Sequence, residues 1–197
     1  MQVSFYPQLL DYKISQTLEL SKILAGIKNG RWAAEVLATR ALSDKAYVLA
    51  KRQLPCFTAS GTFATRRAAD LLTHSGLIAL DIDTKANAGI DLIAVRGRIE
   101  ADSHTYACFT SVGGRGLCVL VPIPVDRHHD AFRAAATYYQ HTYGVAVDAV
   151  CLGVSQQHFV SYDPALYLNE GATAFEETLP KPTGIVSEHS HASEFIR

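Results

Sequence analysis

Two aspartates separated by one residue, Asp81 and Asp83, follow the apolar run 76–80. On a β-strand, residues two apart project to the same face, so both carboxylates would point one way while Ile82 points into the core. Two like charges this close raise each other's pKa unless a cation lies between them. Hard divalent ions such as Mg²⁺ or Mn²⁺ meet that need, and such carboxylate pairs anchor two-metal phosphoryl transfer. Alternatively, the two aspartates simply mark the exit of the strand into a loop.

A second segment, Ser111–Gly116, places three glycines and one arginine between two apolar runs. Glycines let the backbone approach a ligand closely and aim N–H groups at an anion, and Arg115 can pair with a phosphate through two hydrogen bonds. No Gly-Lys-Ser/Thr sequence follows, so the segment is not a Walker A loop and an ATPase is disfavoured. Taken alone, the segment also fits a glycine-rich hairpin with an exposed arginine.

A third acidic residue, Asp148, comes directly after a short alternating apolar stretch. It would supply a further metal ligand if its strand lies beside that of Asp81, whereas such an aspartate more commonly caps a helix or a turn. Several basic side chains are candidates for contacts with a nucleic-acid backbone, or else form an ordinary solvated surface. These residues are Lys51, Arg52, Arg66 and Arg67.

The elements that must position these groups change in character along the chain. Residues 1–55 are expected to be mostly helical, with one helix ending near Asn29, a second over about 31–40 and a third from Ser43 to about Arg52. Beyond residue 55, predicted strands alternate with predicted helices. The strands are expected at 56–63 (with a turn), 76–82, 104–111, 117–123 and 158–163, and the helices at 65–72, 89–101 and 126–143. This order predicts an α+β domain with one main sheet, in which 76–82 is a buried central strand.

Composition restricts the class of protein. The chain has 197 residues, of which 48% are hydrophobic and 19% charged, which excludes a disordered polymer. The net charge of −1 gives no global positive field, so nucleic acid would have to bind a local basic groove. No apolar run approaches the roughly 20 residues that span a bilayer, and the N-terminus has no signal-peptide pattern. We therefore expect a cytoplasmic protein without a membrane partner.

The same patterns predict how the chain is divided. A single domain is expected over 1–170, with a helical part at 1–55 and a core that carries the chemistry at 56–170. Residues 171–197 are polar and are expected to form a linker or tail. The four cysteines have no zinc-knuckle spacing, so we expect reduced, buried thiols and no structural zinc site.

The order of the three motifs resembles the archaeo-eukaryotic primase superfamily, in which an Asp-x-Asp/Glu motif precedes a Ser-Gly-rich strand-loop-strand motif and a hydrophobic-Asp motif. More narrowly, three segments are similar to the VirE N-terminal domain family, which is found ahead of helicase-like modules in bacterial mobile elements and phages. These segments are 54–83, 109–123 and 147–169. The resemblance covers about residues 50–170. It implies an RRM-like primase-polymerase core with one main mixed or antiparallel sheet flanked by helices.

The resemblance also implies roles for particular side chains. The catalytic metal ligands would be Asp81, Asp83 and Asp148, holding Mg²⁺ or Mn²⁺. Nucleotide phosphates would meet Ser111, Gly113, Gly114, Arg115, Gly116 and Cys118. The chain departs from the superfamily at two positions, because Cys118 stands where a phosphate-contacting histidine is expected and Gln156 where a basic residue is often seen. Both departures remove cationic charge from the place where a triphosphate would lie.

The function implied is metal-dependent nucleotidyl transfer on DNA or RNA with nucleoside triphosphates, by a primase-like domain of a replication or mobile-element protein. One alternative is a catalytically silent nucleic-acid-binding module that positions DNA for a helicase partner. A third reading is a metal-dependent nuclease or phosphodiesterase that uses the same acidic cluster.

Overall fold

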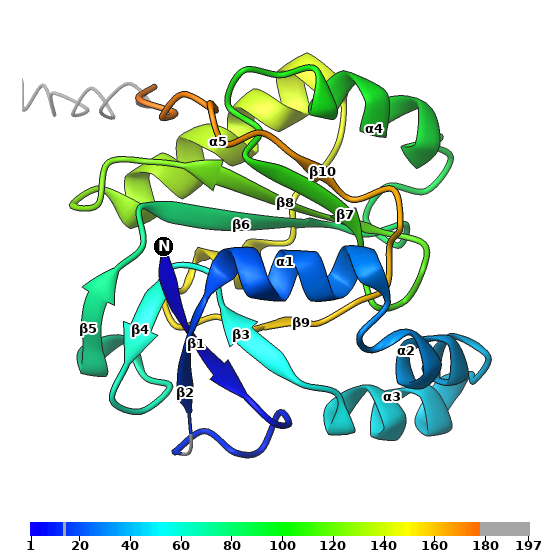
Figure 1. Ribbon diagram of the computed structural model, residues 1–197. Helices are drawn as coiled ribbons and strands as arrows, with labels where there is room; N and C mark the ends of the chain where they lie inside the picture. Colours follow the sequence, from blue (N-terminus) through cyan, green and yellow to red (C-terminus); the bar gives the residue numbers. More distant parts are fainter. Residues whose placement is uncertain (14, 178–197) are drawn as a thin grey trace, which may run out of the picture.

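The computed structural model describes residues 1–13 and 15–177, which form a mixed α+β structure (Figure 1). The helices are α1 (Leu20–Asn29), α2 (Ala33–Arg40), α3 (Asp44–Gln53), α4 (Leu92–Glu100) and α5 (His128–Tyr143), with short 3₁₀ turns η1 (Ala68–Asp70) and η2 (Ala149–Leu152). The strands are β1 (Gln2–Tyr6), β2 (Gln16–Glu19), β3 (Cys56–Thr58), β4 (Gly61–Phe63), β5 (Leu71–His74), β6 (Leu77–Ile82), β7 (Ala107–Thr110), β8 (Leu117–Pro122), β9 (His158–Phe159) and β10 (Tyr167–Leu168).

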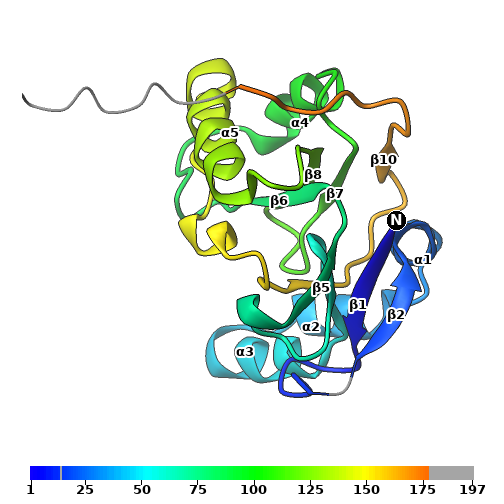
Figure 2. The same cartoon turned by 90° about the vertical axis from the view of Figure 1, so that its left-hand side faces the viewer.

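The strands form two four-stranded sheets and a two-stranded one. The first sheet has the order β2-β1-β3-β9, the second β10-β7-β8-β6, and β4 pairs with β5. Every pairing is antiparallel. Helices α4 and α5 lie on one side of the second sheet, while α1 and the first sheet lie on its other side (Figures 1 and 2).

The alternation of side chains on β6 directs Asp81 toward the space between the two sheets. Ile78, Leu80 and Ile82 pack in one core cluster with α4 and α5, whereas Leu77 and Ala79 pack in another with α1, β1 and β3. Because residues two apart share a face, Asp81 projects to the side of Leu77 and Ala79.

Several predicted elements are confirmed, and others are wrong. The helices expected near 31–40, 43–52, 89–101 and 126–143 and the strands near 76–82, 104–111 and 117–123 are present with shifted ends. The N-terminal part does not begin with a helix, because β1 and β2 form over Gln2–Tyr6 and Gln16–Glu19, and β1 pairs with β3 more than 50 residues away. Residues 65–72 contain only the turn η1 before β5, which pairs with β4. At the N-terminus the long-range pairing of β1 with β3 overrides local helix preference, whereas β4 and β5 are neighbours in the chain that pair with each other.

The prediction of one main sheet with 76–82 as its central strand is also wrong. Strand β6 is buried but lies at the end of its sheet order, next to β8 only. Near Asp81 its outer edge meets Asp148, whose backbone N–H donates to the Asp81 carbonyl oxygen.

The packed structure continues past the predicted boundary at residue 170. The Phe175 ring is 1% exposed and lies against the rings of His104 and Tyr138. The backbone N–H of Phe175 also donates to the carbonyl of Pro122. The remainder of the predicted tail, 178–197, lies outside the described residues. Among the residues that the structure describes, none of the helices has the length and apolar character needed to cross a membrane.

Candidate functional site

A pocket of about 370 Å³ lies where the end of β6, the start of β8, the glycine-rich loop and the first sheet meet. It is lined by most of the residues that the sequence singled out. These are Lys51, Asp81, Asp83, Ser111, Gly113, Arg115, Gly116, Cys118 and Asp148. Motifs separated by tens of residues in the chain therefore share one cavity.

The three aspartates reach the pocket from different local structures. Asp81 belongs to β6, Asp83 follows it, and Asp148 precedes η2. Asp148 is tied to β6 by a hydrogen bond of 2.9 Å from its backbone nitrogen to the Asp81 carbonyl oxygen. The sequence predicted Asp148 as a metal ligand only if it lies beside Asp81. In the structure the two residues are adjacent.

Turn hydrogen bonds orient two of these carboxylates. Oδ1 of Asp83 accepts from the Ala86 nitrogen at 2.7 Å, and Oδ1 of Asp148 accepts from the Val150 nitrogen at 3.0 Å. Within residues 1–13 and 15–177, Oδ2 of either residue accepts no hydrogen bond. Asp148 therefore caps a turn and still offers an oxygen to the pocket, so the two readings of this residue do not exclude each other. Oxygen donors of this kind suit Mg²⁺ or Mn²⁺.

Asp81 also belongs to a tighter cluster with Cys118 and His158. Cys118 is its cross-strand partner on β8, and His158 comes from β9 in the other sheet. His158 Nδ1 lies 3.4 Å from Asp81 Oδ1 and 3.9 Å from Cys118 Sγ. Burial by itself would raise the pKa of Asp81, but the charge and hydrogen bonding of His158 hold it below the ordinary value. Burial raises the pKa of the Cys118 thiol well above its usual range.

The motifs do not single out His158, although it lies within the segment 147–169. It stands 40 residues from Cys118 and reaches the site because β9 pairs with β3 in the first sheet. A search for metal ligands by sequence spacing cannot find His158, because only the packing of the two sheets brings it close to Asp81 and Cys118.

The glycine-rich loop closes tightly over the end of β6. The Ser111 nitrogen donates to the Gly116 carbonyl oxygen at 2.8 Å, and the Gly114 nitrogen to that of Ser111 at 2.9 Å. Gly114 has a φ of 75°, in the left-handed region that favours glycine. A Cβ on Gly116 would stand 2.7 Å from the Ile82 carbonyl oxygen, so only glycine permits this approach. Arg115 is exposed beside the pocket.

Arg40 of α2, which the sequence analysis did not select, holds this loop from behind. Its guanidinium donates to the carbonyl oxygens of Val112 and Ser111, both at 3.1 Å. It also donates to Ser161 Oγ at 3.1 Å and to the Tyr162 carbonyl oxygen at 3.0 Å. One side chain therefore joins the N-terminal helices, the loop and the segment after β9.

The basic residues proposed to contact nucleic acid separate into two groups. Lys51 lines the pocket, with its ammonium 4.9 Å from the centre of the Phe159 ring. Arg52, Arg66 and Arg67 are not among the pocket-lining residues. Arg66 donates to the Leu9 carbonyl at 2.7 Å, and Arg67 pairs with Asp70 at 2.9 Å. A further lysine that does line the pocket is Lys85.

Fold and site together define a mixed α+β domain with an acidic, glycine-lined pocket bordered by cationic side chains. The family model for the BT4734-like N-terminal domain matches residues 49–168, which include the whole of the pocket except Tyr47. The chain belongs to this family. No curated protein and no solved structure matched it.

Proposed function

We propose that this domain is primase-like and carries out metal-dependent nucleotidyl transfer on DNA or RNA. The observation that supports it most is the shared pocket, in which three aspartates face a glycine-rich loop and an arginine. Phosphoryl transfer needs divalent ions to neutralise charge and donors to orient the phosphates. The pocket holds carboxylates that can bind divalent ions, and loop residues with an arginine that can orient phosphates.

The chain order around the pocket supports an RRM-like core within this proposal. Elements β6, α4, β7, β8 and α5 follow one another, and β8 lies between β6 and β7 in the sheet. A strand-helix-strand unit split by an antiparallel third strand is the arrangement of ferredoxin-like folds. Residues 145–148 reach the free edge of β6 through the Asp148–Asp81 bond, where such a unit would place its last strand.

The roles within the pocket follow from the donor types. Asp81, Asp83 and Asp148 would hold Mg²⁺ or Mn²⁺, which supplies charge neutralisation at the transferred phosphate. The N–H groups of Gly113 and Gly116 and the Arg115 guanidinium would orient the remaining phosphates, because both are anion-binding groups. Gly114, which the resemblance also assigns to phosphate binding, does not line the pocket, and its N–H donates to the Ser111 carbonyl oxygen. Lys51 and Lys85 add positive charge at the rim of the pocket.

An imidazole from another strand lies beside Cys118, where the sequence lacks the expected histidine. His158 brings an imidazole to 3.9 Å from the Cys118 sulfur, from a different strand and a different sheet. This ring lies close to the position where the resemblance expects a histidine. Its placement favours an active enzyme over a silent module.

The test is incorporation of labelled nucleotides on primed and unprimed templates with Mg²⁺ or Mn²⁺. We expect incorporation by the wild type and its loss in Asp81→Ala/Asp83→Ala, since the metal ligands are removed. The control Asp126→Ala/Asp130→Ala removes the same charge at exposed positions and is expected to keep the activity. Nucleic-acid binding without nucleotide incorporation would instead indicate a catalytically silent module that serves a helicase. Shortening of the nucleic-acid strand would indicate a nuclease.

A further inference from the structure

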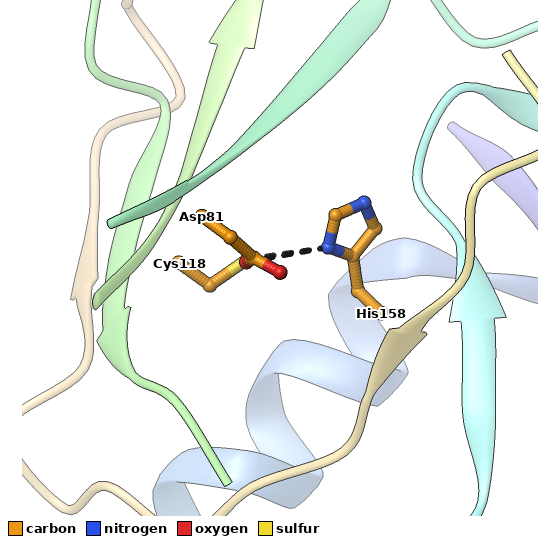
Figure 3. A group of neighbouring side chains, drawn as sticks. All are labelled: Asp81, Cys118 and His158. Carbon is orange, nitrogen blue, oxygen red and sulfur yellow. Dashed lines mark hydrogen bonds and ion pairs between the residues drawn. The ribbon is translucent and has the colours of Figure 1, made fainter. Parts of the chain in front are cut away.

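Three potential ligand atoms of different chemistry converge beside the pocket. Asp81 offers a carboxylate oxygen, Cys118 a sulfur and His158 Nδ1, and all three atoms lie within 4.8 Å of one another. Figure 3 shows the His158 ring facing Asp81 and Cys118 from across the space between the sheets. His158 and Cys118 are almost fully buried, while the Asp81 side chain is 40% exposed.

The geometry does not fit a nucleophilic cysteine. In a Cys-His-Asp arrangement the base contacts the nucleophile through one ring nitrogen and the carboxylate through the other. Here both Asp81 and Cys118 approach the same atom, Nδ1. A single nitrogen carries at most one hydrogen, so it cannot serve both neighbours as a donor.

The spacing does fit a metal ion at the centre of the three atoms. Zinc lies about 2.3 Å from a cysteine sulfur and about 2.0–2.2 Å from a histidine nitrogen or a carboxylate oxygen. Tetrahedral angles then place neighbouring ligand atoms roughly 3.3–3.6 Å apart. His158 Nδ1 lies 3.4 Å from Asp81 and 3.9 Å from Cys118, and the Asp81 and Cys118 ligand atoms lie within 4.8 Å, so a movement of the Cys118 side chain would meet this geometry.

We propose that Asp81, Cys118 and His158 form a zinc site whose fourth position opens into the pocket. Thiolate and imidazole ligands select zinc over magnesium, which requires a shell of oxygen atoms. The Cys118 proton would pass to solvent as the sulfur–zinc bond forms. Three protein ligands with one open position is the pattern of zinc sites that act on a bound water or ligand rather than closed structural sites.

Rigid elements build this site before any ion arrives. Asp81 and Cys118 are directly paired across β6 and β8, and His158 is held by β9. Since Oδ1 of Asp81 faces His158, Oδ2 of the same carboxylate remains for the three-aspartate set. The two proposed sites share Asp81, and zinc binding is measured apart from nucleotide incorporation.

The test is a zinc titration of the full, tag-free chain against a chromophoric chelator, together with Co²⁺ spectroscopy. We expect one ion per chain and a near-ultraviolet thiolate-to-cobalt band in the wild type. Cys118→Ala and His158→Gln should each weaken zinc binding by more than about 100-fold, because loss of a direct ligand exceeds the roughly 10–100-fold effect of an outer partner. Cys108→Ala, which shortens a buried cysteine on the neighbouring strand, should bind as the wild type does.

Three results would overturn the proposal. One is the absence of stoichiometric binding at micromolar zinc. A second is cobalt binding without a thiolate band, which would place the ion on histidines elsewhere, and this readout needs no variant to fold. The third is displacement of zinc by millimolar Mg²⁺, which would mean that carboxylates alone hold the ion. None of these results bears on nucleotide incorporation, so the two proposals can fail separately.

Discussion

The backbone nitrogen of Asp148 lies 2.9 Å from the carbonyl oxygen of Asp81, to which it donates a hydrogen bond. This contact joins the third acidic motif to the first at the free edge of β6. It places the Asp148 side chain beside the pocket that Asp81 and Asp83 also line. The proposed metal set therefore depends on backbone geometry that substitutions of the Asp148 side chain leave intact.

Asp148→Asn should lower Mn²⁺ affinity by more than about tenfold, or about 1.4 kcal/mol, because it removes a ligand charge. Asparagine keeps an oxygen that can accept from the Val150 nitrogen, so η2 should stay capped and the melting temperature unchanged. Mn²⁺ electron paramagnetic resonance measures the affinity, with Asp126→Asn as the exposed control. Equal Mn²⁺ binding by all three proteins would remove Asp148 from the metal set.

Gly116→Ala should destabilise the fold by about 1–3 kcal/mol, the usual cost of an extra buried methyl group. The added Cβ would meet the Ile82 carbonyl oxygen at 2.7 Å, so the loop must move away from β6. Gly97→Ala is the matched control, since its Cβ meets nothing within 4 Å and alanine favours a helix by about 0.5–1 kcal/mol. Urea unfolding of both variants measures the difference. A Gly116→Ala protein as stable as the wild type would show that the loop does not pack as described.

Arg40→Lys should lower the free energy of unfolding by about 1.5–3 kcal/mol, the range for hydrogen bonds to a charged group. Lysine keeps the charge but cannot reproduce the planar fork that reaches the Ser111 and Val112 carbonyls together. As a positioning residue, Arg40 should also affect triphosphate binding through the loop, which equilibrium dialysis measures. Arg52→Lys, at an exposed position, is the control. If Arg40→Lys weakens neither property, the loop is held by other contacts.

His128 should make the protein sensitive to mild acid. Burial, followed by the charges of His74 and His129, lowers the pKa of His128 to about 4 in the folded state. An unfolded histidine titrates near about 6.5, so between these values the unfolded chain binds more protons. Stability should therefore be complete above about pH 6.5 and fall as the pH drops toward about 4.

The variant His128→Gln should lose part of this acid sensitivity, while the exposed control His141→Gln should keep it. Melting temperatures measured from about pH 6.5 down to about pH 4 distinguish His128→Gln from His141→Gln. Identical slopes for wild type and His128→Gln would assign the acid transition to other groups.

The parts of the site that could be predicted from the sequence are those encoded by local pattern. The apolar run before Asp81 predicts a buried strand, and the glycines of 111–116 predict a tight loop between strands, as β6, β7 and β8 bear out. Local pattern could not give the order of the strands. It missed β1, which pairs with β3 more than 50 residues further along the chain, and β2, which pairs with β1.

His158 and Arg40 show why the rest of the site was not predicted. The motif residues include neither of them, although His158 lies within the segment 147–169. Each reaches the pocket region by long-range packing, His158 through the β3–β9 pairing and Arg40 through contacts more than 70 residues away. Isolated polar residues of this kind become visible only when the sheets are assembled. The same reasoning explains why cysteine spacing gave no indication of the Asp81–Cys118–His158 cluster.

A crystal structure with Mn²⁺ and a non-hydrolysable nucleoside triphosphate would test the three-aspartate site directly. We expect an anomalous manganese peak bounded by Asp81, Asp83 and Asp148, with the phosphates lying along the loop at 111–116. Manganese bound elsewhere, with the nucleotide outside this pocket, would contradict it.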